Sequence, residues 1–191
     1  MEYFDVLDEN GNKTGEVINR DVVHAKGLWH KSVHVWIIRE DKQASKQASK
    51  QEILLQKRAP NKKVYPNLWD ISSAGHLAAG ETPTGGAIRE INEEIGINVL
   101  EKDLEFLFTS KESFVYKDVI NKEFDDVYLL KLDIDINDLT FKDGEVAEVK
   151  WIDFADFVEM VNSQSPELVP NWNLYDKLCK VLNDRFDRGL L

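Results

Sequence analysis

Short runs of apolar and β-branched residues, separated by polar and turn-forming residues, recur along the chain. They predict β-strands at residues 3–7, 16–18, 33–38, 52–56, 105–109, 127–132 and 149–152. The first two runs flank an Asn10-Gly11 pair, which is a strong signal for a hairpin turn. We therefore expect an N-terminal hairpin over about residues 1–20.

Helical periodicity appears in three other segments, at residues 84–95, 154–161 and 173–183. Residues 20–25 fit a short helix or a loop. Predicted strands lie both before and after the 84–95 helix, so the pattern favours an α/β fold with a mixed β-sheet and helices on both of its faces. Between the 33–38 and 52–56 strands the tetrapeptide KQAS occurs twice in tandem, and we expect a polar hairpin loop there.

Length and composition indicate one enzyme-sized domain spanning residues 1–191. Apolar residues make up 42% of the chain and charged residues 31%, which is ordinary for a globular protein. The net charge of −11 argues against a nucleic-acid partner. No apolar run reaches membrane-spanning length and no signal-peptide pattern is seen, so we expect a cytoplasmic protein without a membrane partner. The lone Cys179 is expected to be a core residue, and a homodimer is left open.

The 84–95 helix carries the most informative chemistry. Thr82, Pro83 and Thr84 suit a helix start, and Gly96 suits its end. Glu90, Glu93 and Glu94 are spaced three and four positions apart, which puts three carboxylates on one helical face, while Ala87, Ile88, Ile91 and Ile95 form an apolar face that can pack on a sheet. Like charges this close repel one another, whereas hard oxygen ligands in such a group suit Mg²⁺, with Mn²⁺ as an alternative.

The whole segment GHLAAGETPTGGAIREINEEIGI, residues 75–97, resembles the Nudix box at every fixed position. The resemblance implies an α/β/α sandwich in which this segment is the catalytic loop and helix. It also implies that Glu90, Glu93, Glu94 and the Gly75 carbonyl bind metal, and that the three glutamates and Arg89 are the catalytic residues. Glu81 is expected to support the geometry of the loop and helix.

Outside the box the chain resembles the branch of that superfamily related to isopentenyl-diphosphate isomerase. The resemblance rests on the segments DVLDENGNKTGEVI, HAKGLWHKSVHVWII, LLQKRAPNKKVYPNLWD and VPNWNL. In those isomerases a metal is held partly by three histidines, and His24, His30 and His76 occupy comparable places, although the spacing from His24 to His30 differs slightly. Arg58 and Lys62 match basic residues that contact the substrate diphosphate. Structural roles for these side chains stay open, and the expectation for the histidines is at most weak binding of Zn²⁺ or Mn²⁺.

Two departures from the isomerase pattern decide between the activities. The place of the isomerase acid/base cysteine is taken by Ala74, which cannot move a proton. The full set of Nudix glutamates is retained, which favours metal-assisted attack of water on a diphosphate. We therefore expect a Mg²⁺-dependent hydrolase acting on a nucleoside diphosphate derivative or another small diphosphate ester. An isomerase and a non-catalytic ligand-sensing domain are the alternatives. Glu123, Asp125, Glu145 and Glu148 are further candidates for the general base.

Overall fold

A computed structural model describes residues 2–41, 50–142 and 144–189 of the chain. The tandem KQAS repeat, residues 42–49, lies outside the described residues, so the expectation of a loop there stays a prediction.

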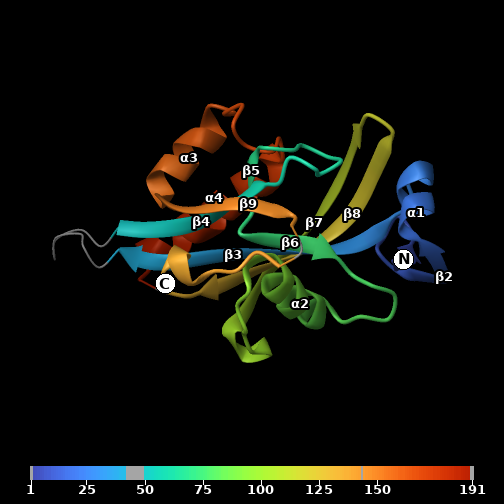
Figure 1. Cartoon of the computed structure of the whole chain (residues 1–191), viewed down its shortest axis with the longest axis horizontal. Coiled ribbons are helices and arrows are strands. Elements are labelled where there is room, and N and C mark those ends of the chain that lie inside the picture. Colours follow the sequence, from blue (N-terminus) through green and yellow to red (C-terminus); the bar gives the residue numbers. More distant parts are fainter. Residues whose placement is uncertain (1, 42–49, 143, 190–191) are drawn as a thin grey trace.

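The described elements follow one another along the chain as a mixture of strands and helices (Figure 1). In chain order they are β1 (Tyr3–Leu7), β2 (Lys13–Asn19), α1 (Arg20–Lys26), β3 (His30–Asp41), β4 (Lys50–Arg58), β5 (Trp69–Asp70), β6 (Ser73–His76), α2 (Pro83–Ile95), the 3₁₀ turn η1 (Glu101–Asp103), β7 (Leu104–Tyr116), β8 (Val119–Lys131), the 3₁₀ turn η2 (Ile136–Asp138), β9 (Val146–Asp153), α3 (Phe154–Asn162) and α4 (Trp172–Asp187).

Strand β3 lies at the centre of a seven-stranded mixed sheet. It runs parallel to β8 and antiparallel to β4 and β6, while β4 also pairs with β5 and β9, and β8 with β7. A separate antiparallel hairpin is formed by β1 and β2, as the Asn10-Gly11 signal predicted.

Each face of the sheet is covered by helices, because alternate residues of the strands are apolar on both faces. Helix α2 packs Ala87, Ile91 and Ile95 against one face, which includes Val33 and Val35 of β3. Helices α3 and α4 cover the other face through a second core cluster, which includes Trp36 and Ile38 of the same strand. Figure 1 shows α2 and α3 on opposite sides of the sheet. The predicted α/β/α sandwich with a mixed sheet is confirmed.

The structure extends the sequence prediction most in the β7–β8 hairpin. Both strands continue well beyond the predicted 105–109 and 127–132 runs, and they pair from Leu104↔Leu130 to Tyr116↔Val119. In the outer part of the hairpin, polar and aromatic residues do not alternate regularly, so the sequence shows no clear period-two pattern there. This part is a strand because it pairs with the opposite strand of the hairpin. The short strands β5 and β6 were also not predicted, since they exist through pairing with β4 and β3.

Helix α1 places His24 near the site described below. The Asn19 side chain accepts a hydrogen bond from the Asp21 amide at its start, and Gly27 ends it with φ 62°. No helix in the described parts of the chain combines the length and apolarity needed to cross a bilayer.

Candidate active site

Helix α2 is held at both ends by the residues that the sequence indicated. The Thr82 side chain accepts a hydrogen bond from the Gly85 amide, and Pro83 occupies the first turn. Gly96 ends the helix with φ 79°, a backbone conformation that glycine adopts without steric cost. These caps fix where the glutamates project from the helix.

Arg89 is the centre of the polar network on this helix. Its guanidinium donates two parallel hydrogen bonds to Glu81, with Nε–Oε1 and Nη2–Oε2 distances of 2.9 Å each. Its Nη1 contacts Glu90 at 2.6 Å and Glu93 at 3.0 Å. Nη2 also donates to the His76 carbonyl at 2.9 Å. Arg89 therefore ties the helix, the loop before it and strand β6 together.

Glu90 lies directly against the backbone of Gly75. A Cβ atom added at Gly75 would come within 1.9 Å of the Glu90 carboxyl carbon, so only glycine leaves room for this carboxylate. Burial raises the pKa of Glu90 to about 7, although the Arg89 charge opposes that rise. This close approach places the Glu90 carboxylate against the Gly75 backbone.

Glu94 is buried, at 2% exposure, on the side of the helix that faces the sheet. Its Oε2 accepts a hydrogen bond from the Ala74 amide at 2.9 Å, and the Gln56 amide nitrogen lies 3.4 Å from both of its oxygens. Burial, followed by the negative charge of Glu90, raises the pKa of Glu94 to about 8. Sequence periodicity placed Glu94 with the other carboxylates, but it did not indicate this burial or the contact with Gln56.

The loop between β4 and β5 supplies basic residues beside the glutamates. Lys62 forms an ion pair with Glu145, one of the candidate bases, and its charge also acts to lower the pKa of Glu94. Glu145 in turn is among the charges that raise the pKa of Glu90. Lys62, Glu145 and the glutamates of α2 thus share one electrostatic environment.

Arg58 has a structural role that the sequence did not indicate. Its Nη1 pairs with Asp70 at 2.8 Å, and its Nε donates to the Val64 carbonyl at 3.0 Å. Asp70 also accepts a hydrogen bond from the buried Tyr175 hydroxyl at 3.2 Å. Arg58 therefore holds the loop of residues 59–68 against β5 and α4, while its charge still acts on Glu145.

His24, His30 and His76 come together at the start of β3, and Glu123 joins them. One potential ligand atom from each of the four side chains lies within 4.8 Å of the others. Among the described residues this is the one group of three or more such side chains that meets this distance. Burial and the two other histidines lower the pKa of His24 to about 3, so its imidazole is neutral and can act as a ligand.

Strand pairing explains how this histidine set assembles. The parallel register of β3 and β8 puts His30 opposite Glu123, and the antiparallel register of β3 and β6 puts Ser32 opposite His76. His76 Nε2 lies 2.8 Å from Glu123 Oε1. Burial disfavours the Glu123 charge, but hydrogen bonds from His30 and His76 hold its pKa well below the usual range. The sequence suggested Glu123 only as a candidate base, because it could not reveal this register.

His34 and Asp125 lie further along the same face of the sheet. His34 Nε2 is 3.8 Å from Asp125 Oδ1, and the Ser32 hydroxyl donates to that same oxygen. Burial raises the pKa of Asp125 to about 7. His34 points away from Val33 and Val35, which face α2.

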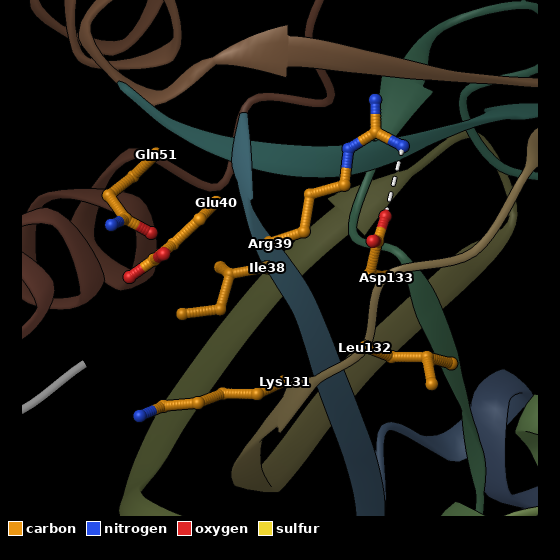
Figure 2. A pocket seen from close by; sticks show the side chains of 7 residues that line it. All are labelled: Ile38, Arg39, Glu40, Gln51, Lys131, Leu132 and Asp133. Atoms are coloured by element: carbon orange, nitrogen blue, oxygen red, sulfur yellow. Dashed lines mark ion pairs between the residues drawn. The ribbon is translucent and has the colours of Figure 1, made fainter. Parts of the chain in front are cut away.

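The hollow drawn in Figure 2 lies at the opposite end of β3 from His30. It has a volume of about 260 Å³ and lies between the ends of β3, β4 and β8. Within it Arg39 approaches Asp133, with Nη1 and Oδ1 3.7 Å apart, and Arg39 also bonds Glu52 at 2.6 Å. None of the glutamates of α2 or the clustered histidines lines this hollow, so it is separate from the candidate active site.

The NUDIX domain family model matches residues 28–172, which include the whole of α2 and its capping loop. The chain belongs to the Nudix hydrolase family.

Relatives of this Nudix protein include hydrolases and isomerases. Nudix hydrolase 3 of Arabidopsis thaliana is 38% identical over 191 residues, covering 96% of this chain. This chain spans only 24% of the length of that protein. An isopentenyl-diphosphate Delta-isomerase of Roseobacter denitrificans is 30% identical over 167 residues, which are 85% of this chain and 84% of the isomerase. The resemblance to both branches is therefore confirmed.

The fold of this Nudix protein is also found among solved structures. The crystal structure of DR0079 from Deinococcus radiodurans superposes with a TM-score of 0.64 and 19% sequence identity, covering 92% of this chain and 98% of that one. At this identity the similarity supports the fold alone.

Proposed function

We propose that this Nudix protein hydrolyses the diphosphate bond of a small diphosphate compound in a Mg²⁺-dependent reaction, with Mn²⁺ able to replace Mg²⁺. The observation that carries the proposal is the arrangement of the three α2 glutamates. Glu90 and Glu93 share one Arg89 nitrogen, while Glu94 is buried next to them with its pKa raised to about 8.

The donor set fits a divalent cation. A buried carboxylate beside two others is unfavourable in its charged form, and a cation that is bound by oxygen ligands relieves this repulsion. Glu90, Glu93 and Glu94, with the Gly75 carbonyl, would hold the ion. When bound, Mg²⁺ supplies positive charge that stabilises the phosphate oxygens and makes an attacking water more acidic.

The remaining residues bind substrate and move a proton. Arg89 orients Glu90 and Glu93, and Glu81 holds Arg89 in place through two hydrogen bonds. Lys62 releases its ion pair with Glu145 and binds a substrate phosphate instead. Arg58 adds positive charge nearby and holds the loop in place. A carboxylate of the glutamate set, or Glu145, accepts a proton from water. The water oxygen then forms a bond to phosphorus as the bridging P–O bond breaks, giving two phosphorylated fragments or a monophosphate and inorganic phosphate.

The isomerase alternative is favoured by one observation, the assembled histidine set. Against it, the acid/base cysteine position is Ala74, whose amide donates to Glu94 and whose side chain carries no proton. A non-catalytic ligand-sensing domain is disfavoured by the complete set of glutamates. We further propose that the protein has no nucleic-acid partner, which the net charge of −11 supports. We also propose a cytoplasmic location without a membrane partner, and we leave a homodimer open.

A screen of diphosphate compounds with Mg²⁺ tests this proposal, with released phosphate and nucleotide products as the readout. Glu93→Gln should lower turnover by orders of magnitude, because a neutral amide is a poorer metal ligand, and the exposed position of Glu93 should leave the fold intact. Glu159→Gln, on an exposed position of α3, is the matched control and should keep full activity. Hydrolysis at the wild-type rate by Glu93→Gln would contradict the assignment.

The histidine set separates the two enzyme alternatives. The hydrolase proposal expects Mg²⁺-supported hydrolysis to survive His24→Ala and zinc to be retained at most weakly. Elemental analysis of the purified protein measures the zinc. Tight stoichiometric zinc that is lost together with activity in His30→Ala would support an isomerase-like site instead.

A further inference from the structure

A buried glutamine lies among apolar residues on the strand beside the α2 glutamates. Gln56 of β4 is 3% exposed, and it directly follows Ile53, Leu54 and Leu55, which are fully buried. Its cross-strand neighbour on β9 is the buried Val149. Burying a primary amide costs free energy unless its hydrogen bonds are made, so packing alone would favour an apolar side chain at this position.

The amide nitrogen of Gln56 is directed at the carboxylate of Glu94. Nε2 lies 3.4 Å from Oε1 and 3.4 Å from Oε2, so the amide reaches both carboxylate oxygens. The Ala74 amide, by contrast, donates to Oε2 alone, at 2.9 Å. One donor from β4 and one from β6 therefore contact the Glu94 carboxylate from the side of the sheet.

The contact with Glu94 decides which way the Gln56 amide points. Its carbonyl oxygen, Oε1, is buried without a hydrogen-bond partner among the described residues. Turning the amide over would bring this oxygen against the two carboxylate oxygens, and acceptors placed together repel one another. The amide thus keeps its donor on Glu94 at the cost of an unpaired carbonyl.

Gln56 is an uncharged donor, although a cation lies close by on the same strand. Arg58, two positions further along β4, is paired with Asp70 at 2.8 Å. A lysine or arginine in direct contact with Glu94 would neutralise its charge and would compete with a metal cation. An amide instead orients the carboxylate and leaves its negative charge available to a metal, as hydrogen-bond donors behind metal ligands commonly do.

We propose that Gln56 is a positioning residue that holds the Glu94 carboxylate in the orientation in which it binds the divalent cation. The inference rests on the proposed function, since it concerns the same metal site, and it adds to that site a residue from outside the Nudix box. Gln56 acts through Glu94, so its loss should weaken metal binding rather than slow the reaction at saturating metal.

Calorimetric titration of the metal-free protein with Mg²⁺ tests this role. Mg²⁺ is chosen because it prefers oxygen ligands, whereas the imidazole groups of the histidine set favour transition metals. Gln56→Met keeps the length of the side chain and removes the amide, and it should raise the Kd for Mg²⁺ about tenfold. In steady-state kinetics the Mg²⁺ concentration that gives half-maximal rate should rise by a similar factor, while kcat at saturating Mg²⁺ changes little.

Gln51→Met is the matched control. Gln51 lies near the opposite end of the same strand, where it lines the hollow shown in Figure 2, so this change should alter neither Mg²⁺ constant. The melting temperature of the chelated protein separates positioning of Glu94 from support of the fold. An unchanged Kd in Gln56→Met would overturn the proposal, whether or not the melting temperature falls.

The titration also distinguishes this proposal from the proposed function. If the wild type binds Mg²⁺ but hydrolyses no diphosphate compound, the proposed function fails, and the Kd of Gln56→Met still decides the role of Gln56. A wild type that binds no Mg²⁺ would overturn that role. If Gln56→Met does not fold, Gln56→Leu removes the same amide and should show the same rise in Kd.

Discussion

At the scale of single residues, Arg89 shows how one side chain organises several others. Its planar guanidinium bonds Glu81 in two places while also reaching Glu90, Glu93 and the His76 carbonyl. These hydrogen bonds and the nearby carboxylate charges raise the pKa of Arg89 further, so it stays charged at any working pH. A lysine could not replace it, because a single ammonium group cannot make the two parallel hydrogen bonds to Glu81 and the further bonds to Glu90 and Glu93.

We therefore expect Arg89→Lys to lower kcat on the order of a hundredfold while the protein remains folded, because a small misplacement of catalytic groups has large effects on rate. Steady-state kinetics on the best diphosphate substrate measure this, with circular dichroism as the check on folding. Arg188→Lys alters an exposed arginine that pairs with Asp184, and it should change nothing. Wild-type kcat in Arg89→Lys would show that the arginine only stabilises the fold.

The raised pKa values of two buried carboxylates predict how the free energy of unfolding of the metal-free protein changes with pH. The pKa values of Glu90 and Glu94 are about 7 and about 8 in the folded protein, above the ordinary value of 4.5. At intermediate pH the folded chain therefore holds protons that the unfolded chain has released, so the free energy of unfolding falls as pH rises through this window. In the presence of a chelator, the free energy of unfolding should therefore decrease between about pH 6.5 and 9. This range lies above the one in which the lowered pKa of His24 affects stability.

Mg²⁺ favours the ionised carboxylates, so adding it should restore stability at the alkaline end of the range. Thermal unfolding in buffers with and without a chelator measures both effects. Glu94→Gln carries no titratable proton at this position and should reduce the pH dependence, leaving the part that comes from the raised pKa values of Glu90 and Asp125. A chelated wild type whose stability rises between pH 6.5 and 9 would mean that Glu94 is ionised in the folded state.

At the scale of elements, the contact between β6 and α2 places the Glu90 carboxylate against Gly75. Gly75→Ala would place a methyl group where the Glu90 carboxylate lies, so the strand or the carboxylate must move. We expect a loss of activity of at least about tenfold together with a lower melting temperature.

Gly15→Ala is a useful comparison for this variant. Gly15 has φ +90° and open space around its Cβ position, so alanine there brings backbone strain without a steric clash near the site. It should lower stability while leaving activity intact. Full activity in Gly75→Ala would show that the close approach to Glu90 is not required for catalysis.

At the scale of the whole molecule, a buried network links the C-terminal helix to the loop that carries Lys62 and Tyr65. Tyr175 of α4 donates to Asp70 of β5, and Asp70 pairs with Arg58 at the base of the loop. Tyr175→Phe should cost about 1 kcal/mol of stability through the lost hydrogen bond. Because the loop is less firmly held, KM should rise more than kcat falls.

Chemical denaturation and steady-state kinetics together test this link. Tyr128→Phe is the matched control, since Tyr128 is buried on the opposite face of the sheet, against α2. It should leave KM unchanged. A Tyr175→Phe enzyme with normal KM and reduced stability would show that the network supports the fold without positioning the loop.

The sequence by itself determined the Nudix box helix, its boundaries and the identities of its polar residues. Thr82, Gly96 and the spacing of the glutamates act within one or two helical turns, so local rules of capping and periodicity are sufficient to read them. The alternation of apolar residues was likewise enough to predict the α/β class and most of the strands. Ala74 in place of a cysteine was also visible without a structure.

Only the tertiary structure decided which residues meet across the sheet. The pairing of β3 with β8 brings His30 to Glu123, residues far apart in the chain, and it depends on a register that no local pattern encodes. The burial of Glu94 and the attachment of Arg58 to Asp70 depend in the same way on how separate elements pack together. So does the contact between Tyr65 and Tyr116, because the positions of a loop and a hairpin tip are set by the sheet beneath them rather than by their own sequences.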